Sequence, residues 1–221
     1  MKKIFFSLAT GAVFLIAAVN VFGQEQAEAP KYKNGDFWHF RGAEREGFAY
    51  STAALHGDYK VLYSERKLKV FKLEAGHELE LSEGDGQEFE FSEGDKTYEV
   101  RELKMMLAVR QGALQYLQFP LFVGKKWTGS YRTRIRGARP LLYTNQMESH
   151  VTAIEEVTTP AGTFSSFKIE RQVWRGDWRA WLTYFYSPPT KGIVKWSRHE
   201  ETRGRTCCRR EIELIKFGSA R

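Results

Sequence analysis

The second half of the chain alternates apolar and polar residues in runs that end at glycine or proline. Between residues 163 and 174, Phe167 and Ile169 share one parity, and Lys168 and Glu170 share the other. Alternation at period two is typical of a half-buried β-strand. Comparable runs cover roughly residues 145–157, 163–174, 178–187, 193–199 and 209–216. Strands that follow one another through tight turns predict an antiparallel sheet.

Two short segments have the composition of tight turns. Pro160 fixes one backbone dihedral and Gly162 tolerates a positive φ, so residues 158–163 predict a turn between two strands. Phe164 falls on the opposite parity from Phe167, which predicts a bulge at Ser165-Ser166. The tripeptide 175–177, Arg-Gly-Asp, is interpreted as a hairpin turn and not as an adhesion motif.

Shorter alternating runs occupy the first half of the chain. They include Val61 with Tyr63, then residues 79–81 and 89–91, and the sequence Ser-Glu-Gly-Asp recurs at 82–85 and 92–95. We interpret this repeat as two hairpin turns of a meander, because it lacks the ligand pattern of a calcium loop. A short helix at 104–110 stays an alternative. The predicted fold class is all-β, a curved antiparallel sheet or an incompletely closed β-barrel.

The N-terminus has the pattern of a secretory signal peptide. Two lysines precede an apolar run and then small residues, so we predict a signal peptide at 1–23, a flexible leader at 24–34 and a single antiparallel β domain at 35–221. An uncleaved membrane anchor is the alternative. The prediction places the protein in the periplasm of a Gram-negative bacterium or outside the cell, soluble after cleavage.

Charge and cysteine content narrow the range of partners. The formal net charge of +7 favours contact with anionic surfaces, while export makes nucleic acid an unexpected partner. The only two cysteines, Cys207 and Cys208, are adjacent. They are compatible with a vicinal disulfide, a pairing between chains or free thiols. Histidines are dispersed without metal-ligand spacing, so no metal or other cofactor is expected.

The sequence contains no recognisable catalytic constellation. No serine stands on a glycine-flanked elbow, and the cysteines have no histidine and acid placed to activate them. Adjacent carboxylates such as Glu155 and Glu156 would point to opposite faces of a strand. We therefore expect no enzymatic activity. A pair of carboxylates from distant strands, acting on envelope glycans, stays an alternative because sequence alone does not reveal it.

Three motifs in the second half carry a family resemblance. FPLFVGKKW (119–127), VTTPAGTFSSFKIER (157–171) and WLTYFYSPPTKGIVK (181–195) resemble, in that order, a family of bacterial exported proteins of unknown function. The family pattern is FPLxVGxxW, then PAGTF, then GxVK. The resemblance covers roughly residues 35–217 and implies an open β-barrel similar to periplasmic lipoprotein carriers. It carries no functional residue onto this chain.

Aromatic residues are concentrated between positions 174 and 196. On the predicted strand 178–187 both parities are largely apolar, so we expect both of its faces to be covered by protein, a partner or a ligand. One face would belong to the core and the other would line a concave groove for a lipid-like or other hydrophobic molecule. The predicted ligand-binding residues are Trp174, Trp178, Trp181, Tyr184, Tyr186, Trp196, Arg179 and Arg198.

The predicted function is therefore non-catalytic binding in the periplasm or envelope. The alternative is a structural or interaction module that docks on another envelope protein. An ordinary two-layered core would also account for the aromatic residues.

Overall fold

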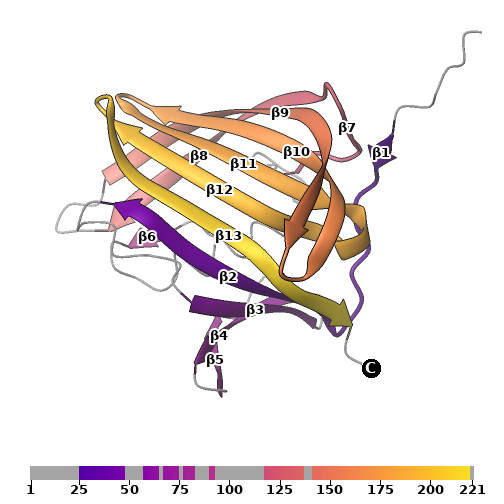
Figure 1. The fold of residues 1–221 in the computed structure, drawn as a ribbon. Coiled ribbons are helices and arrows are strands. Elements are labelled where there is room, and N and C mark those ends of the chain that lie inside the picture. The colour runs from indigo at the N-terminus through magenta and orange to yellow at the C-terminus, as the bar shows by residue number, and fades with distance from the viewer. Residues whose placement is uncertain are drawn as a thin grey trace, which may run out of the picture.

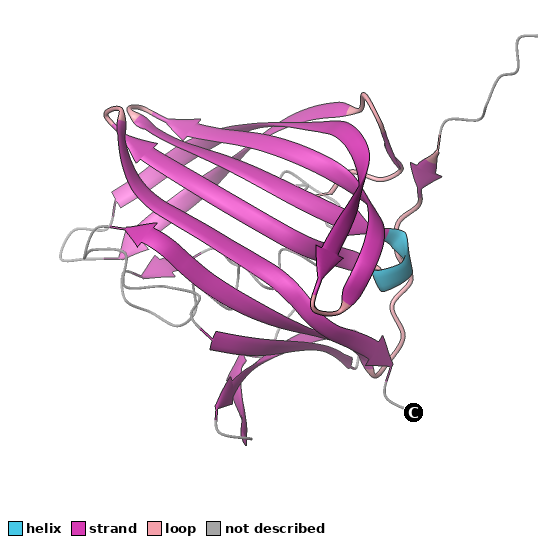
Figure 2. Ribbon diagram, viewed as in Figure 1, coloured by secondary structure: helices cyan, strands magenta, loops and turns pink. Residues whose placement is uncertain are grey.

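The protein is described from a computed structural model, which covers residues 25–47, 57–64, 67–74, 77–82, 90–92, 117–136 and 141–219. The predicted signal peptide, the acidic turns that follow Ser82 and Ser92, and the segment 104–110 lie outside the described residues. Within them the chain is almost entirely β-structure, with one 3-10 turn (Figure 2).

The strands fall into a large sheet and a small one. Their bounds are β1 (Gln26–Ala27), β2 (Asp36–Gly47), β3 (Gly57–Ser64), β4 (Lys67–Glu74), β5 (His77–Ser82), β6 (Glu90–Ser92), β7 (Leu121–Phe122), β8 (Lys126–Arg136), β9 (Leu141–Thr159), β10 (Gly162–Arg175), β11 (Trp178–Ser187), the 3-10 turn η1 (Pro188–Thr190), β12 (Gly192–Thr202) and β13 (Arg205–Ser219).

The large sheet contains eleven strands in the order β5-β4-β3-β2-β13-β12-β11-β10-β9-β8-β6. It curls so that β8 lies behind the plane of β11 and β12, while β3 to β5 turn away below (Figure 1). Its first and last described strands, β5 and β6, do not pair with each other. The predicted fold, a curved and incompletely closed antiparallel sheet, is confirmed.

The five predicted strands of the second half are confirmed: β11 has the predicted bounds, and the other four are longer than expected. β9 through β13 pair as successive antiparallel neighbours. The segment 175–177 forms the predicted turn, with Gly176 at φ +48° between β10 and β11. The meander prediction was wrong for β5 and β6, the described strands on either side of the first acidic turn. β5 and β6 stand at opposite edges of the sheet, and β6 pairs in parallel with β8.

The hairpin formed by β9 and β10 bends over towards β13 (Figure 1). At its tip Gly162 has φ +133°, and the Ala161 amide donates to the Leu214 carbonyl at 3.3 Å. The Phe164 and Phe217 rings meet edge to face, 5.8 Å apart. The predicted bulge lies elsewhere: the register shifts between Lys168 and Ile169, not at Ser165-Ser166. The PAGTF motif thus ties two strands that are not neighbours in the sheet.

The expected leader contacts the fold. β1 pairs with β7, and the Tyr32 hydroxyl donates to the Lys191 carbonyl at 3.2 Å. The Tyr32 ring also packs edge to face on Trp38, with centroids 5.5 Å apart. Ordered structure therefore begins before Gly35, the residue at which the sequence predicted it to start.

Candidate functional site

The even-numbered residues of β11 face the core. Ala180, Leu182, Tyr184 and Tyr186 are all buried. Residues paired across neighbouring strands share a face, so Arg171 and Arg198, which pair with Leu182, point the same way. We call this side of β10 to β12 the inner face. It also includes Trp178, Trp196 and Glu200.

Arg171 brings a guanidinium group into the inner face. The residue is 4% exposed. Its Nε donates to Ser149 Oγ at 2.8 Å, and its Cζ lies 5.1 Å from the centre of the Tyr184 ring. A charge removed from water is expensive unless hydrogen bonds and favourable electrostatics replace the lost hydration. Arg171 therefore shows that the inner face is not a purely apolar core.

A second polar group lies two strands away from β10, on β12. Arg198 Nε is 2.8 Å from Glu200 Oε1, and these side chains are only 13% and 10% exposed. Trp178 Nε1 donates to Glu200 Oε2 at 3.0 Å. The guanidinium of Arg175 stacks on the same Trp178 ring, with Cζ 4.9 Å from the centroid. Aromatic rings and arginines thus alternate on the inner face from β10 to β12.

The inner face holds five of the eight predicted binding residues. These are Trp178, Tyr184, Tyr186, Trp196 and Arg198. The Tyr184 and Trp196 rings lie 6.4 Å apart, near the arginines. Tyr186 lies towards the other end of β11, packed on Phe119 with ring centroids 5.2 Å apart. Burial raises the pKa of the Tyr186 phenol.

The other three predicted residues lie on the opposite, outer face. Trp174 pairs with Arg179, and Trp181 comes two residues later on the same side. Arg179 is exposed, and Trp181 is 37% exposed. The described part of the chain therefore covers the outer face of β11 only partly, and cover by a partner or a ligand stays a prediction. The sequence could not separate the faces, because Trp181 and Phe185 are as apolar as the residues opposite.

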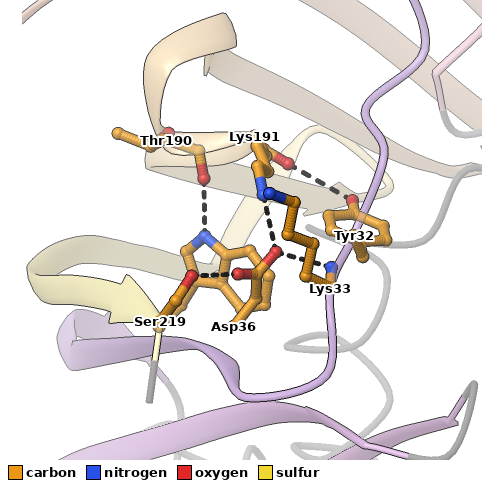
Figure 3. Close-up of polar contacts among 7 residues, drawn as sticks. Tyr32, Lys33, Asp36, Thr190, Lys191 and Ser219 are labelled. Atoms are coloured by element: carbon orange, nitrogen blue, oxygen red, sulfur yellow. Dashed lines mark hydrogen bonds and ion pairs between the residues drawn. The ribbon is translucent and has the colours of Figure 1, made fainter. Parts of the chain in front are cut away.

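A polar cluster that sequence reasoning missed joins the two ends of the sheet domain (Figure 3). Asp36, at the start of β2, is 2% exposed. Its Oδ2 accepts from Lys191 Nζ at 2.7 Å and from the Lys33 amide at 2.9 Å, and its Oδ1 accepts from the Ser219 hydroxyl. We call these four residues the clasp. Burial alone would raise the pKa of Asp36, but the hydrogen bonds from Lys191, Ser219 and Lys33 outweigh it and lower the pKa.

The clasp has an aromatic neighbour. Trp38 Nε1 donates at 2.7 Å to the carbonyl of Thr190, the residue before Lys191. The Thr190 hydroxyl is buried and donates within the turn, to the Ser187 and Gly192 carbonyls. The YSPPTKG segment therefore holds the start of β2 and the residues just before it in place. In the sequence, the prolines and the glycine of this segment indicated a turn but not these contacts.

Metal and membrane signals are absent from the described part of the chain. No group of three or more His, Cys, Asp or Glu residues there converges as a metal site. No helix within those residues is long and apolar enough to cross a membrane. Cys208 pairs with Glu200 in the sheet, and the register skips Cys207. The side chains of both cysteines lie outside the described part.

Comparison with known proteins identifies no family and one distant structural likeness. No protein-family model matches the sequence, and neither does any curated protein. One solved structure resembles the chain, that of a candidate exported protein with a YmcC-like fold from Bacteroides fragilis. The likeness has a TM-score of 0.42 and 15% sequence identity, and covers 87% of this chain and 100% of that one. A likeness at this level supports no conclusion about function.

Proposed function

We propose that the protein is a non-catalytic binding protein of the bacterial envelope, which holds a lipid-like amphiphile against the inner face of β10 to β12. The observation that carries the proposal is the placement of Arg171 above Tyr184, 4% exposed and 5.1 Å from the ring. This face is buried in the core, so a ligand would have to displace the side chains that cover it; an anionic head group and an apolar chain would both then find complementary groups there.

The energetics suit a carrier. Burying an acyl chain gains ~0.8 kcal/mol per methylene, so aromatic side chains such as Tyr184 and Trp196 would supply most of the affinity. Arg175 and Arg198 would orient the head group through charge-assisted hydrogen bonds. The ligand would enter between the edge strands β5 and β6, which do not pair with each other in the described part of the chain.

Localisation in the periplasm is part of the same proposal. It is supported by the signal-peptide pattern at residues 1–23 and by the resemblance of the three motifs to exported proteins. A lipid-like ligand is a natural cargo in that compartment. The alternative, docking on another envelope protein, would use the exposed outer face, where Trp181 lies.

A fluorescent long-chain fatty acid tests the proposal. We expect saturable binding to the processed protein, weakened about tenfold by Arg175→Gln on the inner side, because loss of one charge-assisted contact costs about that much. Arg179→Gln is the matched control, since Arg179 is exposed on the outer side, and it should bind like the wild type. Absence of saturable binding, or equal loss in both variants, would contradict the proposal.

A further inference from the structure

The outer face of the sheet is hollowed by a trough of about 470 Å³ that crosses three neighbouring strands. Three consecutive residues from each strand line it: Glu148, Ser149 and His150 of β9, Glu170, Arg171 and Gln172 of β10, and Trp181, Leu182 and Thr183 of β11. Its volume lies in the range of small-molecule sites, about 300–1,000 Å³.

The pairing of the strands shows which side the trough is on. Gln172 pairs with Glu148 and Trp181, and Glu170 pairs with His150 and Thr183. These six residues form two parallel rows on the outer face. The residues between the rows, such as Arg171, point inward and contribute main chain to the floor. The inward neighbours of Arg171, Ile169 and Val173, do not line the trough.

The side chains of the trough combine one exposed aromatic ring with many hydrogen-bonding groups. Trp181 is 37% exposed, and its ring packs against the His199 ring, with centroids 5.6 Å apart. Carboxylates come from Glu148 and Glu170, and an amide comes from Gln172. We propose that this trough is a binding site for a neutral saccharide. A pyranose ring would lie against Trp181, and its hydroxyls would meet the carboxylates and the amide.

Other ligand classes fit less well. Glu148 and Glu170 disfavour an anionic ligand. The main chains of β9, β10 and β11 are already paired on both sides in the sheet, so an extended peptide has no free strand edge there. The mixed polar walls would leave an acyl chain partly wet, whereas hydroxyl groups spaced around a ring would use these donors and acceptors.

This site is independent of the proposed lipid-like ligand. The trough and the inner face lie on opposite sides of the same three strands, so either ligand could bind without the other. Failure of fatty-acid binding would therefore leave the saccharide site standing, and the reverse also holds.

The test is a titration of tryptophan fluorescence with three neutral pentasaccharides, built from β-1,4-glucose, α-1,4-glucose and β-1,4-N-acetylglucosamine. We expect at least one of them to bind, and Trp181→Ala to weaken that binding about tenfold or more, as measured by calorimetry. Trp174→Ala is the matched control, because Trp174 shares the outer face but does not line the trough. Its affinity should be that of the wild type.

Two further measurements complete the test. Gln172→Ala should also weaken binding without changing the circular dichroism spectrum, and a pentamer of uronic acid should bind more weakly than its neutral counterpart. The proposal is overturned if no neutral pentasaccharide binds at millimolar concentration, if Trp181→Ala leaves the affinity unchanged, or if the acidic pentamer binds best.

Discussion

Lys191 Nζ lies 2.7 Å from Asp36 Oδ2, which joins the turn after η1 to the start of β2, 155 residues away in sequence. The contact is asymmetric in exposure, because the Asp36 side chain is 3% exposed and that of Lys191 32%. Ser219 at the end of β13 donates to the same carboxylate. One buried carboxylate therefore secures three chain segments.

Replacing that carboxylate should destabilise the fold. We expect Asp36→Asn to lower the free energy of unfolding by about 1.5–3 kcal/mol at pH 7, because hydrogen bonds to a charged group contribute that much. Urea denaturation followed by circular dichroism measures the change. Asp58→Asn is the control, since the Asp58–Arg41 pair is exposed and should be worth about 0–1 kcal/mol. Equal losses in both variants would show that the clasp has no special role.

The clasp should also make the stability of the fold depend on pH in the acidic range. The pKa of Asp36 is lower in the folded protein than in the unfolded chain, where it is about 3.9. Its contribution is fully present above the unfolded pKa and is lost as pH falls through the folded pKa. We expect the wild type to lose stability more steeply than Asp36→Asn between about pH 5 and pH 2. Parallel curves would contradict this assignment.

Alkaline conditions should destabilise the protein through Tyr32 and Tyr186. Burial is the main cause that raises the pKa of both phenols. The unfolded chain therefore releases these protons first, and stability falls as pH rises above about 10. An ultraviolet titration should show two tyrosines that ionise only when the fold is lost. Normal titration of all tyrosines in the folded protein would be inconsistent with the burial of Tyr32 and Tyr186.

The Arg198–Glu200 ion pair on the inner face should contribute more to stability than Arg179 on the outer face. Arg198→Gln leaves Glu200 with its Trp178 contact but without the paired charge, and we expect a loss of about 3 kcal/mol. Arg179→Gln should change stability by less than about 0.5 kcal/mol, because Arg179 is exposed. Thermal unfolding measures both. Adding Glu200→Gln to the Arg198 variant should restore part of the loss, and no recovery would argue against a paired charge.

The tip of the β9–β10 hairpin depends on glycine. Gly162 has φ +133°, a conformation that L-residues rarely adopt, and its neighbour Ala161 bonds to Leu214. We expect Gly162→Ala to cost about 1–3 kcal/mol of stability, measured by urea denaturation. Thr163→Ala, at an exposed position beside it, is the control and should cost little. A neutral Gly162→Ala would mean that the tip relaxes freely.

The sequence predicted much of the second half because its signals are local. A strand is indicated by the alternation of Phe167 with Lys168, and the turns are indicated by Gly162 and Gly176. Each of these signals spans only a few residues. The edge strands β5 and β6 were predicted as strands, but their partners were predicted wrongly, for the opposite reason. The parallel pairing of β6 with β8 joins Phe91 to Ile135, and no local pattern encodes that partner.

The candidate site was predicted only in part. Five of the proposed residues share the inner face, but Trp174, Arg179 and Trp181 do not, because apolar residues on both parities hide which side is buried. Arg171 was missed, since a charged residue in an alternating strand is normally expected on the wet face. Asp36 was missed because its partners Lys191 and Ser219 are distant in sequence.

Photolabelling tests the central claim, ligand binding on the inner face, most directly. The processed protein is incubated with a fatty acid that carries a photoreactive group on its acyl chain, irradiated and mapped by peptide mass spectrometry. The proposal predicts adducts, suppressed by excess unlabelled fatty acid, at inner-face residues such as Tyr184 and Trp196. Adducts confined to Trp181 and the outer face, or adducts that excess ligand does not suppress, would contradict it.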